Sequence, residues 1–260
     1  MELRAKAHWD TVDFISDLHL QAQEPQTLEA LASYLQSSPA QALFILGDLF
    51  EVWVGDDCLA QTDSFEAQVA KLLKLASQKI DIYFLCGNRD FLMGSDCMTA
   101  CGATCMEDPT VLQTPNGRWL LTHGDALCLT DTAYLDLRRM VRSPEWQHDF
   151  LEKPLEQRQA MGRDMRMQSE AKKKTLTGFF ADVDTATAID ILQEHNANHM
   201  IHGHTHRPSI HALDAKHSRW VLSDWDMNSS PQRAEVLRLT LSKQAGAKAT
   251  QPARIAFSHL

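Results

Sequence analysis

Short runs of apolar, β-branched and aromatic residues recur along the chain, and each run ends in a cluster of polar residues. Such runs are typical of buried strands. The segment Ala234–Leu241 instead alternates apolar and polar residues, which is typical of a strand with one buried face. We therefore expect a closing strand there and buried strands at six earlier segments: Val12–Ile15, Ala42–Leu46, Ile80–Leu85, Trp119–Thr122, His199–Ile201 and Trp220–Leu222.

Two segments between the first expected strands have the spacing of amphipathic helices. In residues 27–36, Leu28, Leu31 and Leu35 lie on one helical face, and residues 65–75 repeat this spacing of three to four positions. The alternation of strands with helices predicts an α/β fold, in which helices cover a sheet that is rich in parallel strands.

Residues 131–182 interrupt this alternation, because they contain no convincing strand and two or three helical stretches rich in Arg, Lys and Met. We interpret this segment as a helical insertion that covers the core as a lid. The chain then divides into a core of residues 1–130 and 183–242, the lid at 131–182, and a polar C-terminal tail at 243–260.

The composition excludes some classes of function. The chain has 25 Lys and Arg against 34 Asp and Glu, a formal charge of −9, whereas a general nucleic-acid binder needs a basic surface. No apolar run reaches the roughly 18 residues of a membrane-spanning helix, and residues 1–20 lack the apolar stretch of a signal peptide. We expect a cytoplasmic protein without a nucleic-acid partner, for which any membrane contact is peripheral.

The six cysteines include no Cys-x-x-Cys pair. Cys97, Cys101 and Cys105 have the spacing of one helical stripe, which leaves a metal cluster open as an alternative. Buried or half-buried thiols in a reducing compartment are the simpler interpretation.

Metal-binding residue types directly follow five of the expected strands. Because loops at the carboxyl ends of parallel strands converge, these residues should form one site. Two carboxylates, one amide and four imidazoles suit two divalent cations about 3.5–4 Å apart. The segments are Asp17-Leu18-His19, Gly47-Asp48, Gly87-Asn88-Arg89-Asp90, His123-Gly124-Asp125 and His202-Gly203-His204-Thr205-His206.

Asp48 is the natural bridge between two ions, because a carboxylate has two oxygens and Asp48 lies on a short loop between the other contributors. Asp17 and His19 should point to the same side of the chain, as should His204 and His206, because alternate residues of an extended segment do so. The expected metal ligands are Asp17, His19, Asp48, Asn88, His123, His204 and His206.

In this order, the Asp-x-His, Gly-Asp, Gly-Asn-x-Asp, His-Gly-Asp and Gly-His-x-His motifs resemble those of the calcineurin-like metallophosphoesterases. The resemblance implies a two-sheet β-sandwich flanked by helices. It further implies that one ion is held by Asp17, His19, Asp48 and His206, and the other by Asp48, Asn88, His123 and His204.

A narrower resemblance, over about residues 12–228, is to the UDP-2,3-diacylglucosamine diphosphatases. It implies a metal-dependent enzyme that hydrolyses UDP-2,3-diacylglucosamine to UMP and 2,3-diacylglucosamine 1-phosphate (lipid X) in lipid A biosynthesis. It also implies peripheral contact with anionic lipid at the cytoplasmic face of the inner membrane. The matching segments are Ser16–Leu20, Gly47–Glu51 with Trp53 and Gly55–Asp57, Gly87–Phe91, His202–Pro208, and Asp131 with Tyr134 and Arg138.

In such a site a hydroxide bridging two cations would attack the phosphorus attached to uridine, so no Ser or Cys nucleophile is needed. Oxygen and imidazole ligands without a thiolate fit two Mn²⁺ ions, with iron, zinc and cobalt as alternatives. The physiological metal, the acyl-chain preference and the oligomeric state remain open, and no protein partner is predicted.

We expect Asn88 and Arg89 to act in catalysis. Generic members of the resembled superfamily have His at the position of Arg89, and Arg essentially never gives up a proton. The substitution therefore favours a leaving group that is itself a phosphate and that Arg89 clamps through two hydrogen bonds. A structural salt bridge between Arg89 and Asp90 is the alternative.

The family resemblance also implies a set of substrate contacts, several of them in the lid. Where the family has a further lid lysine, this sequence has Leu176, so Lys172 or Lys174 would have to substitute. The expected substrate-binding residues are Asn88, Arg89, Asp131, Tyr134, Arg166, Ser169, Lys173 and His204.

Apolar lid residues such as Phe150 and Leu155 would line an acyl-chain groove, while lid cations meet anionic lipid. An amphipathic cover that simply packs on the core is the alternative. A broader phosphodiesterase or dinucleotide polyphosphate hydrolase is a second hypothesis for the function, against which Arg89 and the lid count. A non-catalytic scaffold is a third, but it should have lost ligands, and all seven are present.

Overall fold

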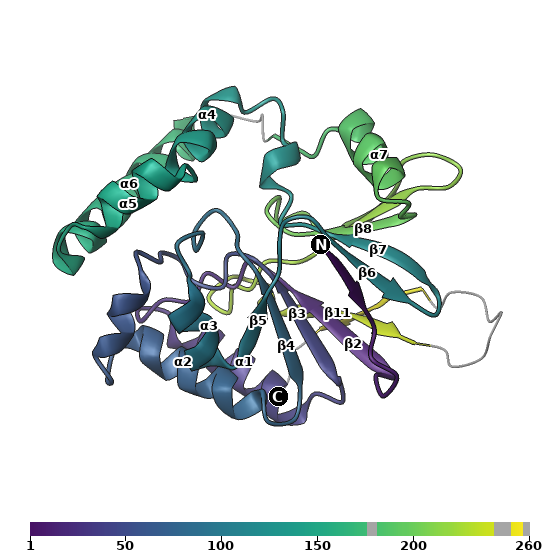
Figure 1. Cartoon of the computed structure of the whole chain (residues 1–260), viewed down its shortest axis with the longest axis horizontal. Coiled ribbons are helices and arrows are strands. Elements are labelled where there is room, and N and C mark those ends of the chain that lie inside the picture. The colour runs from purple at the N-terminus through teal and green to yellow at the C-terminus, as the bar shows by residue number, and fades with distance from the viewer. Residues whose placement is uncertain (176–180, 242–250, 257–260) are drawn as a thin grey trace.

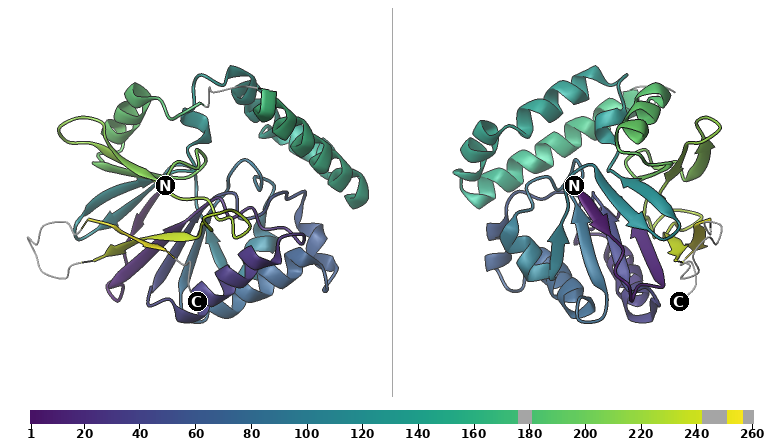
Figure 2. Two further views of the ribbon diagram at one scale, coloured as in Figure 1. Left: turned by 180° about the vertical axis from the view of Figure 1, so that it is seen from behind. Right: turned by 45° about the vertical axis from the view of Figure 1, so that its right-hand side comes forward.

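Two six-stranded sheets pack face to face in the computed structural model, which describes residues 1–175, 181–241 and 251–256 (Figure 1). Helices cover the outer face of each sheet, and three further helices form a separate layer at one side (Figures 1 and 2). The expected α/β fold of two sheets flanked by helices is confirmed.

The first sheet is built around four parallel strands, and a helix lies in each connection between them. At its other side, one strand pairs antiparallel with both of its neighbours. The carboxyl ends of the parallel strands therefore meet at one edge of the sheet. The strand order is β12 (Ala253–Ala256), β11 (Glu235–Thr240), β2 (Thr11–Ile15), β3 (Ala42–Leu46), β4 (Asp81–Leu85) and β5 (Ala103–Cys105).

The second sheet combines parallel and antiparallel pairs. β8 lies between two parallel neighbours, β7 and β10. The pairs β6–β7 and β9–β10 are antiparallel, and β1 runs parallel to β6. The strand order is β1 (Glu2–Arg4), β6 (Thr110–Thr114), β7 (Gly117–Leu121), β8 (His199–His202), β10 (Ser218–Val221) and β9 (Ser209–Ala212).

The helices fall into three groups. α1 (Pro25–Ser37), α2 (Phe65–Ala76) and α3 (Ser95–Cys101) bury apolar faces against the first sheet. α7 (Thr185–Glu194) packs on the second sheet. The separate layer of Figure 2 consists of α4 (Thr132–Val141), α5 (Pro144–Leu151) and α6 (Leu155–Thr175). Two short 3₁₀ helices, η1 (Asp56–Ala60) and η2 (Asp125–Leu127), lie in connections.

The core between the sheets contains a stack of aromatic rings. Phe44 stacks on Phe14 and Tyr83, with ring centroids 5.1 and 5.0 Å apart. Trp9 meets the Phe44 ring edge-on at 6.0 Å, and all four side chains are buried. Because the central strands are buried on both faces, their sequences are apolar at almost every position, which is the pattern that predicted them.

The seven expected strands and two expected helices all occur, with ends that differ from the expected ones by no more than two residues. Five strands within the described residues were not expected, and four of them, β1, β5, β9 and β12, are sheet edges. Edge strands are only half covered, so they lack a continuous apolar run. β12 forms within the segment that the sequence analysis placed in the tail.

The helical spacing of Cys97, Cys101 and Cys105, which left a metal cluster open as an alternative, does not correspond to one helix. α3 ends at Cys101 because Gly102 adopts a left-handed conformation with φ of 66°, and Cys105 lies in β5. All six cysteines are free thiols. None of them belongs to a potential metal-binding group within the described residues. In the same part of the chain, no helix is long and apolar enough to cross a membrane.

Replacing Phe44 by Ala should lower the free energy of unfolding by about 3–5 kcal/mol, because it leaves a cavity between the sheets. Leu75→Ala, at a side chain that is 64% exposed, should change it by less than about 0.5 kcal/mol. Denaturant unfolding followed by circular dichroism measures both variants. Equal losses at the two positions would contradict the assignment of Phe44 to the central core.

Candidate metal centre

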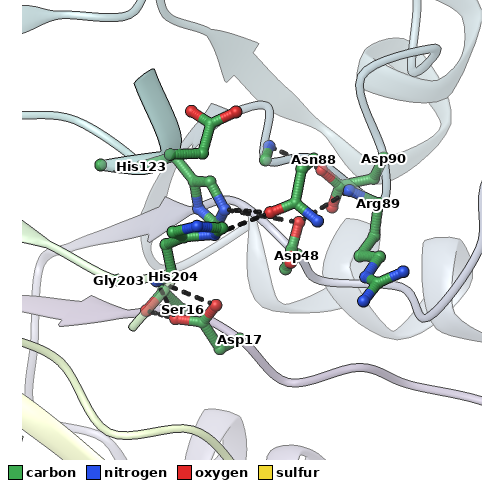
Figure 3. Close-up of polar contacts among 12 residues, drawn as sticks. Ser16, Asp17, Asp48, Asn88, Arg89, Asp90, His123, Gly203 and His204 are labelled. Atoms are coloured by element: carbon green, nitrogen blue, oxygen red, sulfur yellow. Dashed lines mark hydrogen bonds and ion pairs between the residues drawn. The ribbon is translucent and has the colours of Figure 1, made fainter. Parts of the chain in front are cut away.

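All seven expected ligands come together at the carboxyl ends of strands from both sheets. Five of them, Asp17, Asp48, Asn88, His123 and His204, are labelled in Figure 3. The first sheet contributes three loops and the second sheet two. Asp17 and His19 follow β2, Asp48 follows β3, Asn88 follows β4, His123 follows β7, and His204 and His206 follow β8.

Five of these ligands have a left-handed backbone, which residues other than glycine rarely adopt. Only one other non-glycine residue in the described part of the chain, Asn196, has a positive φ. Such conformations cost free energy and persist where the surrounding structure holds them in place. Here the Asp17 N–H donates to the Gly47 carbonyl at 3.0 Å, and the His19 N–H donates to the Asp48 carbonyl at 3.0 Å. The φ angles are 54° at Asp17, 49° at His19, 53° at Asp48, 65° at His204 and 52° at His206.

The Asp17 carboxylate is fixed by neighbours from the opposite sheet. The backbone N–H of His204 donates to both of its oxygens at 2.9 and 3.1 Å, and His206 Nε2 lies 3.3 Å from Oδ1. A side chain at Gly203 would place Cβ only 2.3 Å from Asp17 Oδ2, so this close approach requires glycine. Burial raises the pKa of Asp17, but the charge and hydrogen bond of His206 together with the other neighbouring imidazoles outweigh it, so the pKa is lowered.

The two oxygens of Asp48 face different imidazoles, as a bridging carboxylate requires. Oδ1 lies 3.7 Å from His123 Nε2, and Oδ2 lies 3.9 Å from His19 Nε2. Oδ1 also accepts the Arg89 backbone N–H at 2.8 Å. A Cβ at Gly87 would lie 2.1 Å from Oδ1, so the loop after β4 can approach this carboxylate only as glycine.

Asn88 Oδ1 lies 3.0 Å from His123 Nε2 and 2.9 Å from His204 Nδ1 (Figure 3). His123 Nδ1 donates to the Leu46 carbonyl at 2.9 Å, which directs Nε2 toward Asn88. On the other side of the site, Nε2 of His19 and Nε2 of His206 face each other at 3.2 Å. Ring nitrogens that converge on one another and on oxygens fit a bound cation.

The pKa values of the imidazoles favour metal binding. Burial lowers the pKa of His19 and of His204 to about 4, so both rings are neutral at pH 7, the form that binds metal. Burial also opposes the protonation of His123, but the carboxylates of Asp48 and Asp17 outweigh it and raise its pKa to about 9. The same two carboxylates would attract a divalent cation in place of that proton.

Two groups of side chains have ligand atoms that all lie within 4.8 Å of one another: Asp17, His19 and His206, and Asp17, Asp48 and His123. The first group belongs to the ligand set that the family resemblance implies for one ion. The second group combines residues from the two implied ligand sets, since the resemblance assigns Asp17 to one ion and His123 to the other. The described residues therefore bring together Asp/His clusters that can hold metal at this position.

Arg89 makes no ion pair with Asp90 within the described residues, and Figure 3 shows its side chain extending away from that carboxylate. The Asp90 oxygens instead accept the backbone N–H groups of Gly87 and Leu49, both at 2.7 Å. Burial, together with the neighbouring Asp48 carboxylate, raises the pKa of Asp90 to about 7. Asp90 thus shapes the metal-binding loops, and the half-buried Arg89 side chain lines the cavity described next.

A cavity of about 560 Å³ extends from the candidate metal centre to the helical layer. Five expected metal ligands and Arg89 line one part of it. Apolar side chains from the loop after β3, the loop after β4 and the α4–α6 layer line another. The lining also includes four of the expected lid contacts: Asp131, Tyr134, Arg166 and Ser169. Lys173 belongs to α6, but its side chain lies outside the described residues, as does the whole of Leu176.

Asp125, the last residue of the His-Gly-Asp motif, has a role that the sequence analysis did not identify. Its buried carboxylate accepts hydrogen bonds from the Tyr134 hydroxyl and, at 2.8 Å, from Arg138 Nε. Arg142, directly after the end of α4, donates to the Gly87 carbonyl at 2.9 Å. Asp125 therefore joins α4 to the loop that provides His123. Motif spacing gave no signal for these partners.

The sequence of this chain matches a known protein family and several known proteins. The family model described as calcineurin-like phosphoesterase matches residues 11–208. The chain is 43% identical over 217 residues to a UDP-2,3-diacylglucosamine hydrolase of Aromatoleum aromaticum, covering 82% of this chain and 88% of that protein. It is 41% identical over 216 residues to the hydrolase of that name from Bordetella pertussis, covering 81% and 84%. A solved phosphoesterase from E. coli aligns with a TM-score of 0.46 at 16% identity, covering 95% of this chain and 99% of that one.

Replacing Asp48 by Asn should abolish high-affinity binding of divalent metal while leaving the fold intact. The carboxylate lies in a loop between two imidazoles, so its loss removes a ligand charge without opening a core cavity. Metal content after gel filtration, together with the thermal unfolding transition, measures both effects. Asp214→Asn, in an exposed turn that contains no expected ligand, is the matched control. Metal content equal to that of the parent would refute the bridging role.

Proposed function

We propose a function from one premise: the chain belongs to the calcineurin-like phosphoesterases and, within them, to the family of UDP-2,3-diacylglucosamine hydrolases. The protein hydrolyses the diphosphate bond of UDP-2,3-diacylglucosamine, releasing UMP and 2,3-diacylglucosamine 1-phosphate in lipid A biosynthesis. The observation that most supports this function is that a candidate metal-binding cluster and an apolar wall line one and the same cavity. A substrate with both a diphosphate and acyl chains matches that combination.

The site would hold two divalent cations, and Mn²⁺ suits its mixture of oxygen and imidazole ligands. When bound, they would supply an activated water and neutralise charge on the phosphoryl oxygens. We assign Asp17, His19, Asp48 and His206 to one ion, and Asp48, Asn88, His123 and His204 to the other.

Arg89 binds the phosphate that leaves with the sugar. Its guanidinium lines the cavity beside the metal ligands, and its Nε has no hydrogen-bond partner in the described residues. A phosphate leaving group has a second pKa near ~6 and needs no proton donor, which suits an arginine that stays charged. Asn88, which lies between His123 and His204, orients the attacked phosphoryl group from the metal side.

The α4–α6 layer, within the segment 131–182, acts as the lid and holds the sugar and acyl chains. Asp131, Tyr134, Arg166 and Ser169 line the cavity where it passes under this layer and would contact the acylated sugar, together with Lys173. Apolar side chains continue the lining on both sides of the cavity, and each buried CH₂ group contributes roughly 0.8 kcal/mol. The apolar lining residues are Val52, Trp53, Val54, Phe91, Leu92, Leu137, Trp146, Phe150, Met165, Ala181 and Trp225.

The lid also meets the surface of a membrane that contains anionic lipid. Of the nine exposed large apolar side chains among the described residues, six lie between Leu129 and Met167. Two arginines of the same segment, Arg139 and Arg163, are also exposed, and cations beside apolar side chains are typical of peripheral membrane contact. Met140→Asp should weaken sedimentation with vesicles that contain anionic lipid, whereas Leu75→Asp, on α2, should not. Equal sedimentation of both variants would exclude this surface.

Hydrolysis in ¹⁸O-labelled water should place the label in UMP. The attacked phosphorus is the one attached to uridine, because Arg89 holds the other phosphate as the leaving group. Mass spectrometry of both products measures the position of the label. Label in the sugar phosphate would reverse the proposed orientation, and an absence of either product would remove the proposed reaction.

Met165→Asp should raise KM for the diacylated substrate at least tenfold, because it places a charge in the apolar wall of the cavity. Gln168→Asp is the matched control, since Gln168 lies on the same helix, is exposed and does not line the cavity. A soluble phosphodiester should be cleaved equally by both variants. If both variants lose activity on the two substrates in parallel, the lid only packs on the core and binds no acyl chain.

A further inference from the structure

We propose that Glu51 is a positioning residue that connects the metal ligand His19 to lid helix α6, so that metal binding and lid docking favour each other. This inference rests on the metal centre of the proposed function. It extends that function with a carboxylate that binds neither the metal nor the substrate, and whose two oxygens face different parts of the molecule.

The first contact is between Glu51 and the imidazole of His19. Glu51 is 9% exposed, and its Oε2 lies 2.9 Å from His19 Nδ1. The two atoms are close without hydrogen-bond alignment, and neither has another hydrogen-bond partner in the described part of the chain. Buried polar atoms that lack a partner cost free energy. A small rotation of the ring or the carboxylate makes each the partner of the other.

The second nitrogen of His19 faces the metal centre. Nε2 lies 3.2 Å from His206 Nε2 and 3.9 Å from Asp48 Oδ2. A neutral imidazole has one N–H group, so Nδ1 must be protonated when Nε2 is a ligand. A carboxylate at Nδ1 stabilises that tautomer and fixes the orientation of the ring, as carboxylates do for metal-bound histidines in general.

The other oxygen of Glu51 is bound by the lid. Arg166 Nε, on α6, donates to Glu51 Oε1, and the Arg166 guanidinium also lines the cavity. The two oxygens of Glu51 thus face two elements that are far apart in the sequence: His19 after β2 and Arg166 in α6.

Helix α6 packs against the loop that contains Glu51. Arg158 is 2% exposed and donates to the Val54 carbonyl and to the Asp57 carboxylate. A Cβ at Gly162 would lie 2.8 Å from a methyl group of Val52, so helix and loop are in close contact. These contacts hold Arg166 beside Glu51. Because coupling between two sites is reciprocal, metal that orders His19 and Glu51 also favours the docked lid.

The test compares Glu51→Gln and Arg166→Gln with a control variant, Arg163→Gln. The control removes a positive charge from α6, as Arg166→Gln does, but at an exposed position. Mn²⁺ affinity is measured by competition with a chelator, without any substrate. Glu51→Gln should weaken it about 10- to 100-fold. Arg166→Gln should weaken it about fivefold, although Arg166 is no ligand, and Arg163→Gln should not change it.

Hydrogen exchange provides the second readout. Mn²⁺ should slow amide exchange in α6 of the parent protein and of Arg163→Gln, but much less in Glu51→Gln and Arg166→Gln. In the double variant Glu51→Gln/Arg166→Gln, the losses of affinity should be less than additive, because both substitutions break one chain of contacts.

The failure of this inference is distinct from failure of the proposed function. Parental Mn²⁺ affinity in Glu51→Gln, or an equal effect of Mn²⁺ on α6 in all variants, would overturn the coupling even if the diacylated UDP-sugar is hydrolysed. Coupled metal binding and lid protection in a protein that does not cleave that substrate would support the inference and refute the function.

Discussion

The Asp48 carboxylate lies between imidazoles that come from opposite sheets, and the rest of the site is arranged around it. His19 follows a strand of the first sheet, and His123 follows a strand of the second. The Asp17 carboxylate joins the two sheets again through the backbone N–H of His204. The metal centre therefore forms only when the two sheets are packed correctly, and the aromatic core beneath it fixes that packing.

The need to bring loops of both sheets to one point also explains why strained backbone conformations are concentrated in this region. Loops that leave parallel strands must turn sharply to direct side chains to a common point. Five ligands do so with a left-handed backbone, and Gly87 and Gly203 allow neighbouring loops to approach within a distance that any Cβ would prevent. Such backbone positions are maintained by the surrounding hydrogen bonds, so they are typical of a site whose geometry is set before a ligand binds.

The convergence of the seven expected ligands could be predicted from the sequence, because each follows a strand whose apolar run is visible and because parallel strand ends converge. The edge strands β1, β5, β9 and β12 could not, since half-exposed strands lack that run. The contacts of Asp125 and Glu51 with the lid could not be predicted either. They depend on where helices α4 and α6 lie over the core, and the spacing of residues along the sequence does not predict that position. Arg166 was expected to bind substrate, and the structure adds an ion pair with Glu51 that sequence could not reveal.

The account depends on divalent metal at this centre acting on a diphosphate substrate. The most direct measurement is hydrolysis of UDP-2,3-diacylglucosamine by protein that has been stripped with a chelator and then supplied with Mn²⁺ or Mg²⁺. The account predicts no activity in the stripped protein, full recovery with Mn²⁺, and weaker recovery with Mg²⁺, because imidazole ligands suit Mn²⁺ better than the harder Mg²⁺. Undiminished hydrolysis with the chelator still present would contradict it.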